Sequence, residues 1–335
     1  MTGLLRHRSQ TQRAALLASA SVAISLVLSL GALEGALRVY HRLKEWREQR
    51  ALPPVAARAM VPSRDPELIY EWNPGWSRDG FSVNSLGMAD REVTLEKPPG
   101  VFRIAFFGDS ISANFGHRPR PEIYLNVLGR RLDEEAWRGA RFEVLNFGVN
   151  GYSLLQSVRM LESRALPFAP DLAVVQLCLN DPYPSNTPYA SLMPTGPSRL
   201  WSFFYRRLFP DRFWGWAYVE SAYDETGVGN LRRGIARLAE LARRGPPILA
   251  VLFPYLNAPA YDEWGFERFH EIYRDAARES GLPLLDLYPP FRRAGAIGKL
   301  GIADPIHPGR EAHEVAAAEI EIKLDELKLL PAAGG

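Results

Sequence analysis

The apolar positions beyond residue 100 fall into short unbroken runs, and amphipathic stretches separate these runs. The runs that we expect to be strands are 103–107, 142–147, 172–178, 248–253 and 283–287. The stretches with helical spacing are 121–138, 152–166, 226–244, 263–280 and 309–329. Continuous apolar strands that alternate with helices are typical of a parallel sheet covered on both faces. The pattern therefore predicts an α/β fold, a doubly wound three-layer α/β/α sandwich.

A different pattern occupies the start of the chain, where residues 14–33 carry no charge. At about 1.5 Å per helical residue, this run spans roughly the thickness of a bilayer core. A single transmembrane anchor over 14–36 is the interpretation that we favour. The alternatives are a cleaved signal peptide and a buried helix of a soluble protein. The small residues at 18–20 come early in the run for a cleavage site, and a later cut would fall among charges such as Glu34 and Arg38.

The charges that flank this run bear on its orientation. Three Lys or Arg residues precede the run, and five follow it between residues 38 and 50. The positive-inside rule alone would leave the large domain in the cytoplasm. The rule weakens when a long folded domain follows the span, so the charges alone do not decide the side.

Composition limits the possible classes of protein. The 335 residues carry a net charge of +2, with 47% hydrophobic and 23% charged residues. This balance excludes a disordered chain and a strongly basic nucleic-acid binder. One cysteine, Cys178, excludes an internal disulfide framework and a cysteine-based zinc site.

Turn residues and composition shifts divide the chain into segments. We expect a basic N-terminal tail (1–13), the transmembrane anchor (14–36), a juxtamembrane segment with a Pro-rich linker (37–66), an entry segment packed on the domain edge (67–100), and a catalytic domain (101–330) with an aromatic insertion (201–223).

Polar motifs follow four of the five expected strands. Ser110 comes after the first strand, Gly151 after the second, Asn180 after the third, and Asp304 and His307 after the fifth. Because the carboxyl ends of parallel strands lie at one edge of the sheet, these groups are expected to meet there.

Together these groups supply the parts of an acyl-transfer site. Ser110 would be the nucleophile, His307 the general base and Asp304 the group that orients the imidazole. The backbone N–H groups of Ser110 and Gly151, with the side-chain amide of Asn180, would form the oxyanion hole. No cluster with metal-ligand spacing and no glycine-rich nucleotide loop is visible, so no cofactor or metal is expected.

The ordered motifs Gly108-Asp109-Ser110, Gly151, Asn180-Asp181 and Asp304-Pro305-Ile306-His307 make the sequence similar to the SGNH, or GDSL-type, hydrolases over about residues 101–330. The segment 84–87 and the stretch 145–153 resemble bacterial members with an N-terminal anchor. The resemblance implies a flavodoxin-like sandwich with five parallel strands. It also implies an exported, extracytoplasmic (periplasmic) domain on a single-pass cell-membrane anchor.

The same resemblance implies a serine esterase that works through an acyl-enzyme. The substrate would be an O-acyl ester, for example the O-acetyl groups of a cell-envelope glycan, or a small ester or lipid. The alternatives are an O-acyltransferase acting on an envelope polysaccharide and a non-catalytic envelope scaffold. The sequence departs from the family at Cys178, where the third block normally opens with glycine.

Other residues carry weaker signals. The insertion 201–223 holds ten aromatic residues, which would pack on the core, cover the acyl pocket or lie in the membrane interface. His270 and His313 lie on expected helices and are expected at the surface. Asp109 and Asp181 are interpreted as structural hydrogen-bonding groups.

Overall fold

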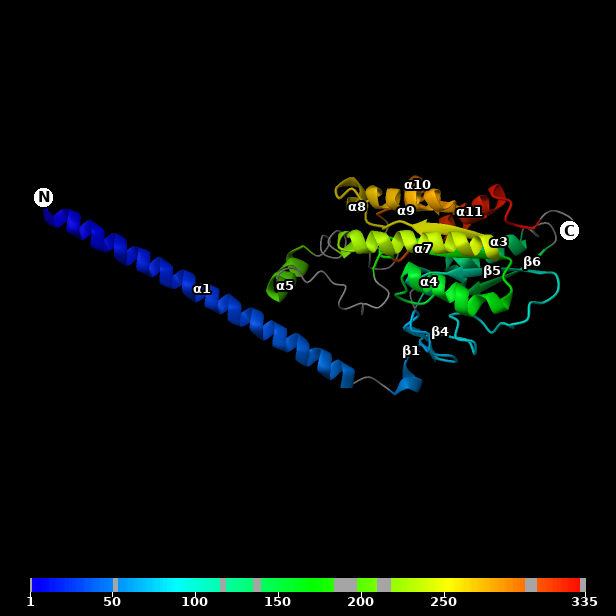
Figure 1. Ribbon diagram of the computed structural model, residues 1–335, viewed down its shortest axis with the longest axis horizontal. Coiled ribbons are helices and arrows are strands. Elements are labelled where there is room, and N and C mark those ends of the chain that lie inside the picture. The colour runs from blue at the N-terminus through cyan, green and yellow to red at the C-terminus, as the bar shows by residue number, and fades with distance from the viewer. Residues whose placement is uncertain are drawn as a thin grey trace. The chain divides into compact units, whose positions relative to one another are not determined.

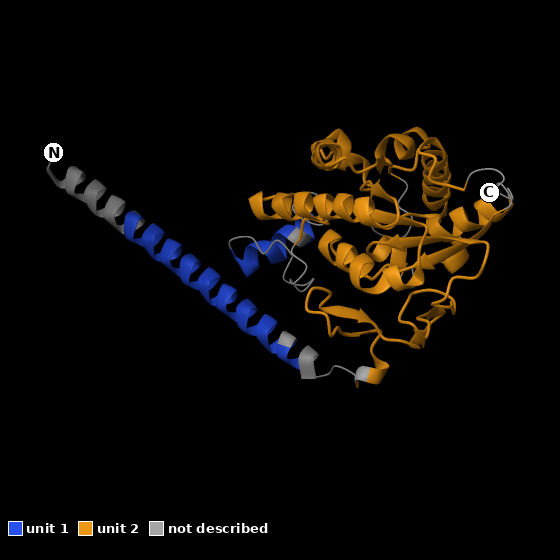
Figure 2. Ribbon diagram, turned by 45° about the vertical axis from the view of Figure 1, so that its right-hand side comes forward, with its two compact units in different colours: residues 1–53, 194–213 blue, residues 54–193, 214–335 orange. Residues whose placement is uncertain are grey.

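A computed structural model describes the chain except for residues 1, 51–53, 115–118, 135–139, 184–197, 210–217, 299–305 and 332–335. The chain divides into two compact units (Figure 2). One comprises residues 1–53 and 194–213, and the other comprises residues 54–193 and 214–335.

The second unit is built on a five-stranded sheet (Figure 1). Its strands are β5 (Val101–Phe107), β6 (Arg141–Asn146), β7 (Leu172–Cys178), β8 (Ile248–Phe253) and β9 (Leu284–Asp286). They are all parallel and lie in the order β6-β5-β7-β8-β9. This is the flavodoxin-like order: β6 is added on one side of the first strand, β5, and the later strands are added on its other side. The predicted strands and fold class are confirmed.

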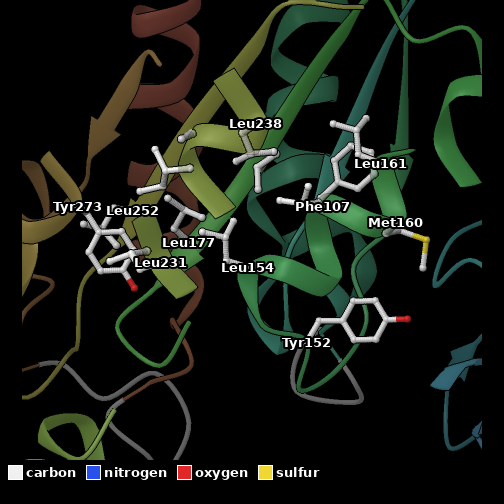
Figure 3. Close-up of a cluster of buried hydrophobic side chains, with 14 of the residues drawn as sticks. Phe107, Tyr152, Leu154, Met160, Leu161, Leu177, Leu231, Leu238, Leu252 and Tyr273 are labelled. Carbon is white, nitrogen blue, oxygen red and sulfur yellow. The ribbon is translucent and has the colours of Figure 1, made fainter. Parts of the chain in front are cut away.

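Helices cover both faces of the sheet because successive side chains of a strand point to opposite faces. In β5, Ile104 and Phe106 join the core cluster beneath α3 (Tyr124–Glu134), α10 (Tyr288–Arg293) and α11 (Arg310–Glu326). Ala105 and Phe107 join the cluster beneath α4 (Leu154–Met160), α7 (Glu225–Arg244) and α9 (Glu267–Ser280). Figure 3 shows the latter cluster, where Phe107 of the sheet lies among side chains of these helices.

Several short elements lie outside the sheet and its main helices. They are α2 (Ser110–Ala113), α6 (Tyr218–Glu220), α8 (Ala258–Asp262), the 3₁₀ turns Val55–Ala57, Arg120–Glu122 and Leu166–Phe168, and a π-helical turn, Leu161–Ala165.

The segment ahead of β5 forms two small antiparallel hairpins. β1 (Met60–Pro62) pairs with β2 (Tyr70–Trp72), and β3 (Ser77–Arg78) pairs with β4 (Phe81–Ser82). Leu68 and Trp72 are buried in the same core cluster as Phe107. The segment therefore contributes to the hydrophobic core of the second unit.

The first unit contains α1 (Thr2–Arg50) and α5 (Arg199–Leu208). Within α1, the stretch Leu16–Lys44 contains an 18-residue window with a mean hydropathy of 2.2. It is long and apolar enough to cross a membrane, as a signal sequence also would be. The backbone N–H groups of Arg199 and Leu200, at the start of α5, donate to the Glu34 carboxylate at 3.0 and 2.8 Å.

The aromatic insertion does not behave as one element. On α5, Trp201, Phe204 and Leu208 remain exposed, whereas Val219 of α6 and the following Ala222 are buried in the core of the second unit. Residues 210–217 of the insertion lie outside the described residues.

The expectation that His270 and His313 lie at the surface is wrong. Their exposed fractions are 0% and 2%. His270 Nδ1 lies 2.9 Å from Asp286 Oδ1, and His313 Nδ1 accepts a hydrogen bond from the Tyr124 backbone. Burial is tolerated because each imidazole has a buried polar partner at Nδ1.

Candidate active site

The turn after β5 carries Ser110 at the first position of α2. The Asp109 side chain caps this helix by accepting a hydrogen bond from the Ile111 N–H at 2.9 Å. The Asp109 N–H in turn donates to Gln176 Oε1 on β7 at 3.0 Å. Gly108 has φ +149°, and a Cβ there would lie 2.2 Å from the same Gln176 oxygen. The turn can therefore approach β7 only because residue 108 is glycine.

The structure brings Ser110 and His307 together although 197 positions separate them. His307 Nε2 lies 2.9 Å from Ser110 Oγ, and both residues are half-buried. This distance allows the imidazole to accept the hydroxyl proton as the oxygen attacks a carbonyl. Asp304, the predicted third member of the triad, lies outside the described residues.

The loop after β6 carries Gly151, which has a left-handed backbone with φ +77°. Asn146, the last residue of β6, ties this loop to α2. Its side chain accepts from the Gly148 N–H and donates to the Ser112 carbonyl, both at 2.9 Å. The Gly151 loop and the Ser110 turn are thus joined by one buried amide.

Side chains of the β1–β2 hairpin hold the same loop from the other direction. Trp72 Nε1 donates to the Gly148 carbonyl at 2.8 Å, and the Tyr70 hydroxyl donates to the Asn150 carbonyl at 3.0 Å. A buried carbonyl that is hydrogen-bonded to a rigid ring is fixed in position. The segment ahead of the sheet therefore shapes the loop that carries Gly151.

The turn after β7 carries Asn180, and Cys178 lies directly beneath it at the end of the strand. The Cys178 thiol contacts Asp109 Oδ2 at 3.0 Å and also the Asn180 side-chain oxygen. Burial, followed by the nearby Asp109 and Asp181 carboxylates, raises the pKa of the Cys178 thiol well above its usual range. The thiol is therefore protonated at neutral pH and acts as a hydrogen-bond donor.

Asp181 holds the backbone of the same turn. Its carboxylate accepts a hydrogen bond from the Cys178 N–H at 2.7 Å. Burial raises the pKa of this carboxyl well above its usual range, and the charge of Asp109 adds to the effect. Asp109 and Asp181 both act as structural hydrogen-bonding groups within the turns that carry Ser110 and Asn180.

A pocket lies where these turns meet. Its walls are Ile111, Cys178, Leu179, Asn180, Phe253, Pro254, Tyr255 and Ile306. The empty space, part of it open to solvent, is about 240 Å³. The pocket includes the immediate neighbours of Ser110 and His307 as well as Asn180, so it lies beside the serine–histidine pair.

Sequence reasoning did not find several residues that position this site. Neither Gln176 nor Trp72 belongs to a recognisable motif. Gln176 does carry one signal: it is a polar residue within the apolar run 172–178, and a buried polar side chain needs a hydrogen-bond partner. Among the described residues, no group of three or more His, Cys, Asp or Glu side chains could hold a metal ion.

The sequence from residue 106 to 315 matches the GDSL-like lipase/acylhydrolase family. The chain belongs to this family. The match covers more than half of the chain and includes both Ser110 and His307, while the β1–β2 hairpin lies outside it. Membership in this acylhydrolase family makes the chain an ester-bond hydrolase.

Solved structures are similar to this GDSL-like hydrolase at low identity. TesA is 21% identical, with a TM-score of 0.46 and 68% and 99% of the two chains covered. Axe2, an acetylxylan esterase from Geobacillus stearothermophilus, is 15% identical, with a TM-score of 0.46 and coverages of 67% and 94%. LAE5, a hydrolase from the metagenome of Lake Arreo, Spain, is 16% identical, with a TM-score of 0.47 and coverages of 69% and 97%. No curated protein matches the chain.

Proposed function

We propose that this chain is a membrane-anchored serine esterase that cleaves an O-acyl ester through Ser110, His307 and Asp304. The observation that supports this role most directly is the 2.9 Å separation between Ser110 Oγ and His307 Nε2. Membership in an acylhydrolase family gives the reaction class, and this pair supplies the nucleophile and the base.

The reaction proceeds in two steps. Ser110 Oγ attacks the ester carbonyl while His307 Nε2 accepts its proton, and the protonated imidazole then gives that proton to the leaving alcohol. Water attacks the resulting acyl-serine with His307 as the base, and the carboxylic acid leaves as the proton returns to Ser110. Asp304 stabilises the imidazolium in both steps.

The developing oxyanion is held by three donors. As the first residue of α2, Ser110 has an N–H without an intrahelical acceptor. The Gly151 N–H and the Asn180 side-chain amide complete the set. Loss of one such donor typically costs about 3 kcal/mol of transition-state stabilisation.

The walls of the pocket beside the serine–histidine pair are mostly apolar and include Ile111, Leu179, Phe253 and Ile306. We propose that these side chains receive a short acyl group, so that the substrate is an O-acetyl or similarly short ester, such as one on a cell-envelope glycan. The ratio of kcat/KM for p-nitrophenyl acetate and octanoate tests this point, because a preference for octanoate contradicts it.

The anchor is the part of α1 over residues 14–36, which spans the membrane with the catalytic unit on the extracytoplasmic side. Glu240 on α7 is exposed and distant in sequence from every proposed catalytic residue. In cells carrying Glu240→Cys, a membrane-impermeant maleimide should label the protein without prior lysis of the inner membrane. Labelling that requires lysis places the domain in the cytoplasm and contradicts this topology.

Ser110→Ala tests the nucleophile, with Ser112→Ala as the matched control. Ser112 is on the same short helix, but its hydroxyl is buried against the Tyr124 hydroxyl and Gln176 Oε1. A fluorophosphonate should label the wild-type and Ser112→Ala proteins and leave a folded Ser110→Ala protein unlabelled. If the folded wild-type protein is not labelled, or if Ser110→Ala retains wild-type esterase activity, the proposal is wrong.

A further inference from the structure

Helix α5 presents an apolar stripe to solvent. Trp201, Phe204 and Leu208 are 56%, 48% and 67% exposed, and their spacing of three and four residues puts them on one face. These values already include any contact with α1, which belongs to the same compact unit. The stripe therefore does not serve to pack α5 on α1.

A second observation connects α5 to the end of the apolar run in α1. Glu34 is the first charged residue after the uncharged run 14–33. Its carboxylate accepts hydrogen bonds from the N–H groups of Arg199 and Leu200, and also from Arg38 Nε at 2.7 Å. A carboxylate near hydrocarbon is costly unless it is paired, and these three donors provide the pairing.

The position of this contact agrees with single-pass topology. Everything that follows the span lies on one side of the membrane, so a segment between residues 194 and 213 can reach only the C-terminal end of the span. Glu34 lies at that end. The contact therefore holds α5 at the level where the apolar run meets the headgroups.

The charges of α5 define the surface that it suits. Residues 198–209 contain Arg199, Arg206 and Arg207 and no acidic residue. An amphipathic helix whose apolar stripe includes Trp and Phe, and whose arginines lie outside that stripe, is typical of segments that lie in the interface of anionic bilayers.

We propose that α5 docks on the membrane surface, with Trp201, Phe204 and Leu208 inserted among the lipids and Glu34 fixing the start of the helix. The occupant of the stripe is thus the bilayer that holds α1. This inference rests on the proposed anchor, and the experiment below distinguishes a failure of the anchor from a failure of α5 docking.

Single cysteines carrying an environment-sensitive fluorophore test the docking in full-length protein reconstituted in anionic vesicles. The variants are Phe204→Cys and Leu208→Cys on the stripe, Arg206→Cys at the opposite side of the helix by the 3.6-residue period, and Leu26→Cys in α1. Native Cys178 is only 4% exposed, and the unsubstituted chain measures its background labelling. The readout is quenching by lipids with nitroxide-labelled acyl chains.

Quenching should be at least about twofold stronger at positions 204 and 208 than at 206, and position 26 should be quenched as well. If 26 is quenched while 204 and 208 match 206 or are unquenched, the anchor stands and the docking of α5 is refuted. If 26 is not quenched, the anchor itself is refuted, and the docking is refuted with it.

Discussion

Trp72→Phe is the most direct test of whether the hairpin outside the family match is part of the catalytic unit. The indole is 2% exposed and donates a 2.8 Å hydrogen bond to the Gly148 carbonyl. It also packs on Phe81, with ring centroids 5.1 Å apart. Phenylalanine preserves an aromatic ring at this position but has no N–H. The substitution therefore leaves a buried carbonyl without its donor at the base of the Gly151 loop.

The expected magnitude follows from these contacts. An unsatisfied buried carbonyl costs about 1–3 kcal/mol, and the smaller ring adds a packing defect. A total of about 2–3 kcal/mol corresponds to a fall in Tm of about 4–12 °C for a unit of this size. A displaced Gly151 N–H would also weaken oxyanion binding, for which we expect about a tenfold loss in kcat/KM.

Thermal unfolding and p-nitrophenyl acetate hydrolysis measure the two effects. Trp76→Phe is the control, because Trp76 also packs on Phe81 but donates at 3.2 Å to the Ala57 carbonyl, away from the Gly151 loop. The control should lose little stability and no activity. Wild-type kcat/KM in Trp72→Phe, or an equal loss in Trp76→Phe, would refute the conclusion that the hairpin positions the oxyanion loop.

Three further predictions concern the turns around the nucleophile. Gly108→Ala should prevent folding or cost more than about 3 kcal/mol in denaturant titration, because its Cβ would lie 2.2 Å from a buried oxygen. Gly100→Ala is the control: Gly100 has φ +71° and open space around it, so the substitution should cost only about 1 kcal/mol. Cys178→Ala should lower kcat more than it raises KM, because the thiol contacts the side-chain oxygen of Asn180, a proposed oxyanion donor. Cys178→Ser should restore part of kcat. A change confined to KM would contradict a role for Cys178 in positioning Asn180. The pKa of Asp181 is raised in the folded protein. The free energy of unfolding of the wild-type protein should therefore fall relative to that of Asp181→Asn as pH rises from about 4 toward the folded pKa. Parallel curves of stability against pH for the two proteins would exclude a raised pKa at Asp181.

The sheet could be predicted from the sequence because its strands are buried on both faces. β7 and β8 appear as unbroken apolar runs, and the expected bounds 172–178 and 248–253 agree with the structure. Such runs are a strong signal, because only a doubly covered parallel sheet needs them. Ser110 and His307 could be predicted for a related reason. Each lies in the segment after a predicted strand, at the edge of the sheet where the carboxyl ends of parallel strands lie.

The supporting contacts could not be predicted, because they depend on distances across the fold rather than on local pattern. Trp72 and Gly148 are 76 positions apart, and Asp109 and Gln176 are 67 apart. The burial of His270 and His313 was missed for the same reason. A histidine among polar helix residues appears solvated until its partners, Asp286 and Tyr124, are known.

Three hydrogen-bonding side chains that connect the nucleophile turn, β7 and the Gly151 loop are uncharged. Gln176 accepts from the Asp109 N–H, Asn146 bridges Gly148 and Ser112, and Trp72 donates to Gly148. Neutral hydrogen bonds between buried groups do not change with pH near neutrality and are little affected by salt. It follows that these bonds should persist across the neutral pH range and over a wide range of salt concentration, so the Ser110 turn and the Gly151 loop keep their mutual geometry under those conditions.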